Sequence, residues 1–145
     1  MSNEDKIRVL FLCTHNQARS QMAEGILRHL GKARYEVCSA GNELASEVHP
    51  LAIKTLANMG IDISNHYPKH LNQFLDQEFD YIITTCDRIK ESCPVFPGDP
   101  ERIHWSLSDP SRAEGSEEEK QAVFNDLAVE LGTRIRMLMQ LHRFK

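Results

Sequence analysis

The sequence predicts an α/β fold: a single domain over residues 1–145, with a four-stranded parallel sheet flanked by helices on both faces. Three observations lead to this prediction. Strand-like and helix-like segments alternate along the whole chain, the first strand is apolar at nearly every position, and no repeat, low-complexity tract or linker interrupts the pattern. A continuously apolar strand is typical of a parallel sheet that is buried on both sides. Ligands of such sheets bind beyond the carboxyl ends of the strands.

Four strands are expected from short apolar runs. The first is Ile7–Leu12, and the others are Tyr35–Ala40, Tyr81–Thr85 and Ile103–Leu107. Runs of this length and composition, separated by helical segments, are typical of the strands of βαβ units. Cys86 directly follows the third run, so it is expected near the loop that follows the first strand.

Helices are expected between and after these strands. Apolar residues at helical spacing mark Ser20–Leu30, and Pro50–Met59 begins with a proline, which suits the first turn of a helix. Leu71–Phe79 is expected to be a third helix. The last helix starts at a capping box formed by Ser116 and Glu119. Its apolar residues then recur every three or four positions, at Phe124, Leu127, Leu131, Ile135 and Leu138.

Composition and charge exclude several classes of protein. The chain carries a formal net charge of -4 and no cluster of Lys and Arg, so no nucleic-acid partner is expected. No apolar run approaches the length of a membrane span, and the polar N-terminus does not have the form of a secretory signal. We therefore expect a cytoplasmic protein that binds no membrane. Because the overall charge repels anions mildly, a site for an anion has to be local.

The four cysteines are Cys13, Cys38, Cys86 and Cys93. In a reducing cytoplasm permanent disulfides are not expected, so the choice lies between buried free thiols and redox or nucleophilic groups. Cys38 alternates with neighbours along its strand and is interpreted as a core thiol. A zinc site is not favoured, because no pair has the Cys-x2-Cys spacing and six residues separate Cys86 from Cys93. No metal ligands are predicted.

The segment between the first strand and the first helix has the residues of an oxyanion site. Cys13 and Arg19 flank five residues, and Ser20 follows the arginine. Five residues are enough for a loop to curl around a tetrahedral anion, with its backbone amides and those of the helix N-terminus pointing inward. Arg19 can hold two oxygens with its guanidinium. The predicted oxyanion-binding residues are Thr14, His15, Asn16, Gln17, Ala18 and Arg19.

The same positive surroundings make Cys13 a candidate nucleophile. Inward amides and Arg19 favour the thiolate form of a nearby thiol, and Ser20 can donate a hydrogen bond to the sulfur. Asn16 is expected to help organise the loop. The alternative is a core cysteine followed by a surface arginine, since this spacing also occurs by chance. The place of the motif, at the end of the buried first strand, favours the oxyanion site.

Residues 13–25 have the sequence CTHNQARSQMAEG and resemble the phosphate-binding loop shared by low-molecular-weight protein tyrosine phosphatases and thioredoxin-coupled arsenate reductases. The resemblance covers almost the whole chain. It implies the low-molecular-weight phosphatase-like fold, Cys13 as the nucleophile and Asp109 as the general acid. Its further motifs are Ser39–Gly41, Gly60–Ser64, Cys86, Cys93–Gly98, His104–Trp105 and Asp109–Pro110.

The resemblance implies a relay of thiols in one of the two families. In the arsenate reductases, the cysteine that matches Cys86 attacks the arsenic adduct on Cys13, arsenite leaves, and a Cys13–Cys86 disulfide forms. The cysteine that matches Cys93 then forms a Cys86–Cys93 disulfide, which thioredoxin reduces. The polar segment Asp87–Ser92 suits a mobile, exposed connection between the two cysteines. A phosphatase needs neither thiol, because water hydrolyses its intermediate.

The residues after Asp109–Pro110 also bear on this choice. The phosphatases are similar to one another in an aromatic pair that receives phosphotyrosine, whereas Ser111–Ala113 follow here. The sequence therefore predicts a thioredoxin-dependent arsenate reductase for arsenic detoxification, with weak phosphatase activity as a side reaction. Two alternatives stay open: a low-molecular-weight protein tyrosine phosphatase, and a non-catalytic thiol redox sensor built on Cys86 and Cys93.

The resemblance also implies the partners. Arsenate is the expected substrate, with phosphate or sulfate as competing anions, and thioredoxin is the external reductant, which receives electrons from NADPH through thioredoxin reductase. No bound cofactor is implied. Some family members bind potassium through residues that match Asn16, Glu24 and Ser39, but Lys69 stands where an aspartate completes that site. The hypothesis is that the ammonium group of Lys69 replaces the ion and removes the need for potassium.

Overall fold

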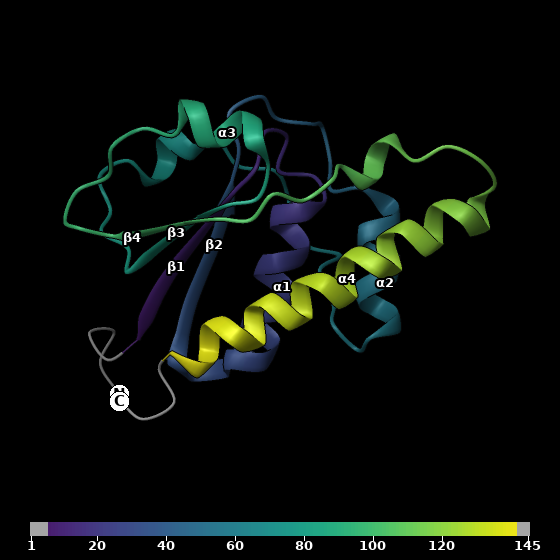
Figure 1. Cartoon of the computed structure of the whole chain (residues 1–145), viewed down its shortest axis with the longest axis horizontal. Coiled ribbons are helices and arrows are strands. Elements are labelled where there is room, and N and C mark those ends of the chain that lie inside the picture. The colour runs from purple at the N-terminus through teal and green to yellow at the C-terminus, as the bar shows by residue number, and fades with distance from the viewer. Residues whose placement is uncertain (1–5, 142–145) are drawn as a thin grey trace.

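The computed structural model describes residues 6–141 and contains the predicted parallel sheet (Figure 1). Its strands are β1 (Ile7–Leu12), β2 (Tyr35–Ala40), β3 (Tyr81–Thr84) and β4 (Glu101–His104). They lie in the order β2-β1-β3-β4, and every pair is parallel. Because β1 and β3 are neighbours, the segments that follow them emerge side by side at the carboxyl edge of the sheet.

The fourth strand begins and ends two or three residues earlier than the predicted Ile103–Leu107. β4 lies at the edge of the described sheet and pairs only with β3, and this ladder ends at the pair formed by Thr84 and His104. The apolar residues that suggested a longer strand, Trp105 and Leu107, are buried in the core as the chain leaves the sheet. Burial, rather than strand pairing, therefore explains the second half of this apolar run.

Helices cover both faces of the sheet, as predicted. Their bounds are α1 Arg19–Gly31, α2 Pro50–Asn58, α3 Asp87–Ser92 and α4 Glu117–Gln140. On one face, α1, α2 and α4 pack together over the β1 side chains of Val9 and Phe11. On the other face, α3 and a 3-10 turn at Leu71–Phe74 pack against Leu10 and Leu12. The sheet thus has one extensively covered face and one face covered by short segments.

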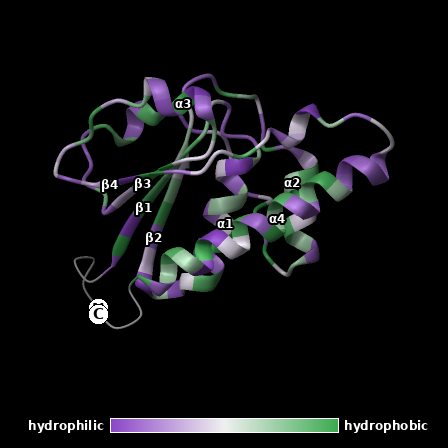
Figure 2. Cartoon of the chain, in the orientation of Figure 1, coloured by the Kyte–Doolittle hydropathy of each residue, from purple (hydrophilic) through white to green (hydrophobic). Residues whose placement is uncertain are grey.

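Polar and apolar residues are distributed as this packing requires. In Figure 2 apolar residues colour much of the central strands, and they alternate with polar residues along α4. α4 starts at the predicted capping box: Ser116 Oγ accepts from the Glu119 amide at 3.1 Å, and Glu119 Oε1 accepts from the Ser116 amide at 3.0 Å. α1, α2 and α4 therefore begin and end close to the residues expected from the sequence.

The predicted helix over Leu71–Phe79 is wrong in its second half, because only Leu71–Phe74 is helical, as a 3-10 turn. Leu71 and Phe74 are buried against the sheet. Phe79 belongs instead to the lead into β3, where the next amide, that of Asp80, donates to the carbonyl of Arg8 at 2.9 Å. The chain has to reach the sheet at this point, so it cannot continue as a helix.

The segment Asp87–Ser92, expected to be a mobile connection, forms the helix α3. Its polar side chains are exposed, in agreement with the sequence, but Ile89 is fully buried against the sheet. A single apolar anchor of this kind holds a short helix in place. Cys86 therefore lies at the start of an ordered turn of helix, and Cys93 lies at its end.

Candidate active site

The loop between β1 and α1 has its carbonyl oxygens turned outward. Those of Thr14, His15 and Gln17 accept hydrogen bonds from backbone amides of the segment 42–49, at 2.9 to 3.2 Å. Within residues 6–141, the backbone amides of 14–20 donate to no backbone carbonyl. The first turn of α1 adds amides that have no partner inside the helix. This is the backbone arrangement that a tetrahedral anion requires.

Asn16 shapes the loop from inside. Its backbone φ is 51°, in the left-handed region that asparagine adopts more readily than most residues. The side chain is fully buried, and Nδ2 donates to Ser20 Oγ at 2.8 Å and to Ser39 Oγ at 3.0 Å. Ser20 thus contacts Asn16, whereas its expected hydrogen bond to Cys13 is not among those of the described residues. One amide group ties the loop to both α1 and β2.

Gln21, which sequence reasoning missed, braces the loop from behind. It is fully buried, and its Nε2 donates to Asn16 Oδ1 at 3.0 Å and to the carbonyl of Tyr67 at 3.0 Å. The signal in the sequence is a pair of polar residues, Gln21 and Glu24, three positions apart on a largely apolar helix. Both side chains are buried, so their polar groups make hydrogen bonds inside the protein, around the loop, and do not face solvent.

Gly41 lets the chain that follows β2 approach the loop closely. A Cβ atom at this position would lie 2.5 Å from the carbonyl oxygen of Thr14 and 2.8 Å from that of Cys13. Both oxygens belong to the backbone, so they cannot yield unless the loop itself moves. Glycine is required here for close approach, and a side chain would displace the loop amides.

Arg19 is fixed beside the loop with its guanidinium held by the opposite segment. Nη1 donates to the carbonyl of Leu107 at 3.0 Å, and Nη2 lies 3.8 Å from Asp109 Oδ2. The residue is only 8% exposed, so water screens its charge poorly. The positive charge of the site is therefore local, as the negative net charge requires. The same pocket is lined by Thr14, His15, Cys86, Arg88 and Arg112.

Asp109 is a carboxylate in this arrangement. Burial favours its neutral form, but hydrogen bonds from the Ser111 hydroxyl at 2.6 Å and amide at 3.0 Å, together with the charges of Arg19 and Arg112, outweigh that effect. The pKa of Asp109 therefore lies below its usual value. To act as the general acid, Asp109 must first take up a proton, which requires one of these cations to be neutralised.

The thiols of Cys13 and Cys86 lie close enough to affect each other's ionisation. Both are free and buried. The interaction with Cys86 and burial raise the pKa of Cys13 more than the charge of Arg19 lowers it, so the expected lowering of the Cys13 pKa is wrong for this structure. The interaction with Cys13, and then the hydrogen bond with Thr14 Oγ1 at 3.1 Å, outweigh burial and lower the pKa of Cys86 to about 5. The two sulfurs therefore share one proton and one negative charge at neutral pH.

This shared proton predicts a pH dependence. The pKa of Cys86 is lowered to about 5, so the ultraviolet absorbance of one thiolate per chain should appear as the pH rises through that value. Below that pH the absorbance should be lost. Cys13→Ala removes the principal donor, so the midpoint should move up towards the ordinary thiol value of about 8.5. Cys38→Ala is the matched control and should leave the midpoint in place. An unchanged midpoint in Cys13→Ala contradicts the shared proton.

Cys93 lies apart from Cys86, at the other end of α3. It is half-buried, and its Sγ accepts a hydrogen bond from Arg102 Nη1 at 3.1 Å. Since the whole of α3 lies between the two cysteines, about 10 Å of helix axis separates them. Cys38 is half-buried on β2, where burial raises its pKa. Among the other cysteines of the described chain, Cys86 alone lines the pocket of the Cys13 loop.

The residues matched to a potassium site gather beside the loop. Ser39 Oγ donates to Glu24 Oε1 at 2.5 Å, and Lys69 Nζ lies 3.9 Å from the same oxygen. The Lys69 amide donates to Asn16 Oδ1 at 2.9 Å. Burial lowers the pKa of Lys69, an effect that Glu24 opposes. Within residues 6–141, no group of three or more His, Cys, Asp or Glu side chains is arranged to hold a metal ion.

The remaining side chains of the loop contact neighbouring segments. His15 Nδ1 lies 2.7 Å from the carbonyl oxygen of Glu43, and Gln17 Nε2 donates to Ser111 Oγ at 3.3 Å. Ala18 is buried. Apart from Arg19, the loop therefore offers an anion its backbone amides more than its side chains.

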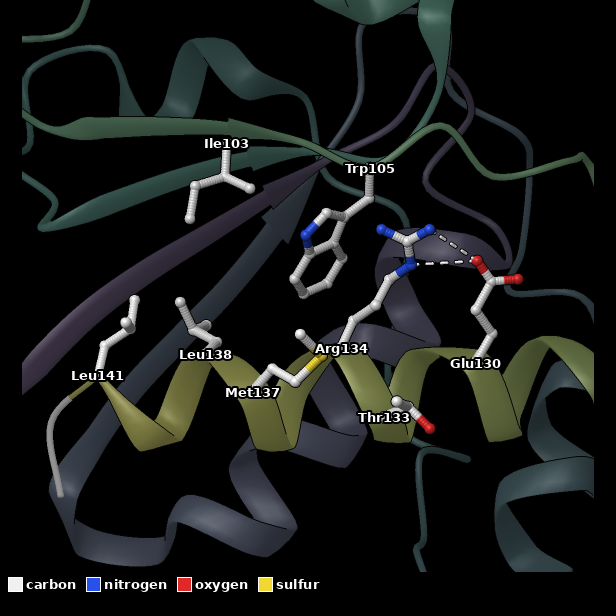
Figure 3. A pocket seen from close by; sticks show the side chains of 8 residues that line it. All are labelled: Ile103, Trp105, Glu130, Thr133, Arg134, Met137, Leu138 and Leu141. Atoms are coloured by element: carbon white, nitrogen blue, oxygen red, sulfur yellow. Dashed lines mark hydrogen bonds and ion pairs between the residues drawn. The ribbon is translucent and has the colours of Figure 1, made fainter.

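A separate apolar groove lies between β4 and α4 (Figure 3). Trp105 and Leu138 line it, and Arg134 lies over the Trp105 ring at 5.9 Å while pairing with Glu130 at 3.0 Å. No cysteine lines this groove. Thiol chemistry is therefore assigned to the loop of Cys13. The other lining residues are Ile103, Thr133, Met137 and Leu141.

The geometry of a Cys-to-Arg loop after the first strand of a parallel sheet agrees with the family comparison. Residues 8–143 match the family of low molecular weight phosphotyrosine protein phosphatases, and the chain belongs to this family. The resemblance inferred from the sequence is thereby confirmed. No helix within residues 6–141 is long and apolar enough to cross a membrane.

Within this family the chain is similar in sequence to arsenate reductases. It is 43% identical to the arsenate reductase of Halalkalibacterium halodurans over 88% of this chain and 91% of that protein. It is 40% identical to that of Bacillus subtilis over 92% and 94% of the two chains.

Solved structures of both kinds of enzyme share the fold. A thioredoxin-dependent arsenate reductase of Corynebacterium glutamicum matches with a TM-score of 0.75 and 34% identity, over 96% of this chain and 63% of that one. A low molecular weight protein tyrosine phosphatase from T. tengcongensis matches with a TM-score of 0.76 and 28% identity, over 93% and 99%. The fold therefore does not distinguish a reductase from a phosphatase. The number and positions of the cysteines have to distinguish them.

Proposed function

We propose that this protein reduces arsenate to arsenite in the loop of Cys13 and that thioredoxin restores its thiols. The observation that carries the proposal is the place of Cys86, which lines the pocket of the Cys13 loop together with Arg19 and lies 3.1 Å from Thr14 Oγ1. A phosphatase needs one thiol at this place, whereas a reductase needs a second thiol within reach of the first. The similarity to arsenate reductases of two bacteria supports the same choice.

In the first step the loop amides and Arg19 bind arsenate, and Cys13 attacks the arsenic atom. Transfer of the proton of Cys13 to the thiolate of Cys86 supplies the nucleophile. A sulfur–arsenic bond forms, and an arsenic–oxygen bond breaks as water leaves. The bound anion neutralises Arg19, which raises the pKa of Asp109 and lets it deliver the proton that the departing oxygen needs.

In the second step Cys86 gives up the proton that it received, which the departing arsenite takes, and its thiolate attacks the sulfur of Cys13. A disulfide forms between them, the sulfur–arsenic bond breaks, and its electron pair stays on arsenic, which leaves as arsenite. Cys86 already lies beside the loop of Cys13 before the reaction, so this step needs little movement. Thr14 Oγ1, 3.1 Å from Cys86 Sγ, stabilises the attacking thiolate.

In the third step Cys93 attacks Cys86, and Cys13 is released as a thiol. A disulfide requires its two Cα atoms to be within about 7 Å. About 10 Å of helix axis separates Cys86 from Cys93, so α3 has to unwind during this step. Its length of six residues and its single buried side chain, Ile89, keep the cost of unwinding low. The exposed polar residues of α3 leave the new disulfide open to thioredoxin, which NADPH supplies with electrons.

A single-turnover experiment tests this proposal. Reduced protein is mixed with arsenate in the absence of thioredoxin, arsenite is quantified, and disulfides are mapped by mass spectrometry. We expect about one arsenite per chain and a Cys86–Cys93 disulfide, and in Cys93→Ser the Cys13–Cys86 disulfide instead. Arsenite without either disulfide would exclude the relay, and a Cys86–Cys93 disulfide that forms regardless of arsenate would favour a redox sensor.

Phosphatase activity is a second candidate, because Cys13, Arg19 and Asp109 also form the set that phosphate-ester hydrolysis requires. The position of an aromatic platform is taken by Ser111–Ala113, of which Arg112 is exposed. We therefore propose only weak hydrolysis of aryl phosphates. Such hydrolysis should persist in Cys86→Ser and Cys93→Ser, which separates it from the relay.

We also propose that the ammonium group of Lys69 takes the place of a potassium ion beside Glu24. Turnover should then be the same, within about twofold, in potassium and in tetramethylammonium salts at equal ionic strength. Lys69→Met should lower activity, because it removes the ammonium group beside Glu24, whose carboxylate accepts from the Ser39 hydroxyl that contacts Asn16. Lys69→Arg should retain more of the activity. Strong activation of the unmodified protein by potassium would contradict this assignment.

A further inference from the structure

Arg102 joins β4 to the end of α3. Its Nη1 donates to Cys93 Sγ at 3.1 Å, and its Nη2 donates to the carbonyl of Pro94 at 3.0 Å. The neighbouring residue Ile103 belongs to the opposite face of the sheet, where it packs against the large core. Alternation along β4 therefore directs Arg102 to the α3 face. One guanidinium holds both the side chain and the backbone of the Cys93 turn.

The other end of α3 is fixed independently. Asp87, its first residue, lies 2.8 Å from His104 Nε2 and accepts from Ser106 Oγ at 3.0 Å. His104 Nδ1 lies 2.7 Å from Thr84 Oγ1, which ties the contact to β3. Cys86 also continues directly from β3. The Asp87 end is thus anchored several times, whereas the side chain of Cys93 itself is held by Arg102, beside a weaker contact of 3.4 Å between Asn42 Nδ2 and Ser92 Oγ.

We infer that Arg102 is a positioning residue that holds Cys93 away from Cys86 until Cys86 has formed a disulfide with Cys13. The inference rests on the proposed function, in which Cys93 displaces Cys13 from Cys86. In that step the Cys93 thiolate attacks Cys86 Sγ, the Cys13–Cys86 bond breaks, and its electron pair and a proton go to Cys13. The oxidising equivalents come from arsenate, reduced in the preceding step.

The geometry decides whether Arg102 favours the dithiol or the disulfide form of Cys86 and Cys93. Cys93 has to move several ångströms towards Cys86 to form a disulfide, and both contacts of Arg102 break when it does. The reduced protein makes these contacts, and the movement of Cys93 breaks them, so they stabilise the dithiol relative to the disulfide. Arg102 therefore makes the Cys86–Cys93 pair harder to oxidise in the absence of arsenate and easier for thioredoxin to reduce.

A redox titration tests this inference. Arg102→Met is equilibrated with glutathione buffers of graded ratio, and the Cys86–Cys93 disulfide is quantified by thiol alkylation and mass spectrometry. We expect the equilibrium to shift towards the disulfide by roughly three- to tenfold, which lowers the potential by about 15–30 mV. Arg102→Lys, which can retain one of the two contacts, should fall between the variant and the wild type.

Two controls keep the outcomes distinct. Glu91→Gln changes an exposed charge on α3 that makes no hydrogen bond or ion pair within the described residues, and it should leave the potential unchanged. If the wild type forms the Cys86–Cys93 disulfide but the potential is unchanged in Arg102→Met, the role of Arg102 is overturned and the relay is not. Failure of the wild type to form the Cys86–Cys93 disulfide at all overturns the relay as well.

Discussion

Replacing Cys13 with serine is expected to abolish arsenate reduction. Cys13 is the only group of the loop that can form the bond to arsenic, and an alcohol in its place has no comparable nucleophilicity. The loss in kcat should be on the order of 10⁴-fold or more, the scale on which removal of a catalytic nucleophile acts. Arsenite production in a thioredoxin-coupled assay measures it.

Anion binding by the loop provides a control for Cys13→Ser. The backbone amides of residues 14–20 and Arg19 remain, so Cys13→Ser should still bind phosphate or arsenate, which isothermal titration can detect. Retained binding with lost turnover identifies Cys13 as the nucleophile. Turnover that survives in this variant contradicts the assignment.

Replacing Arg19 with lysine is expected to reduce kcat/KM for arsenate by roughly 10²–10³-fold. The charge is retained, but an ammonium group cannot both contact the Leu107 carbonyl and grip two oxygens of the anion as a planar fork does. Because Arg19 also lies 3.8 Å from Asp109, the substitution should alter the pH dependence of kcat as well as binding.

A matched substitution at the rim separates this effect from general electrostatics. Arg112 is highly exposed and lines the same pocket, and its Nε lies 3.9 Å from Asp109 Oδ2. Arg112→Lys should change kcat/KM by less than about threefold, since exposed pairs contribute little. Equal losses at both positions would mean that Arg19 acts through charge alone.

The centre of the site could be predicted from the sequence because its parts lie close together in the chain. Cys13, Arg19 and the strand before them fall within a few residues, and the strand–loop–helix context fixes how they meet. The approach of Cys86 followed from the end of β3 and the order of parallel strands. Asp109 was found through the resemblance and not through spacing.

The supporting contacts could not be predicted, because they join residues that are distant in sequence. Gln21 meets the Tyr67 carbonyl, and Arg102 meets Cys93, only once the sheet has formed. The helical state of Asp87–Ser92 depends on the burial of Ile89, a single apolar residue in a polar segment. The ionised state of Asp109 follows from Ser111 and Arg19 and not from its own place in the chain.

The most direct test of the account is NADPH consumption with arsenate, thioredoxin and thioredoxin reductase, in the wild type and in Cys86→Ser, Cys93→Ser and Cys38→Ala. We expect sustained turnover in the wild type and in Cys38→Ala, and none in the other two variants. Turnover that persists without Cys86 or Cys93 would contradict the relay. No turnover in the wild type, together with brisk hydrolysis of an aryl phosphate by all four proteins, would identify a phosphatase instead.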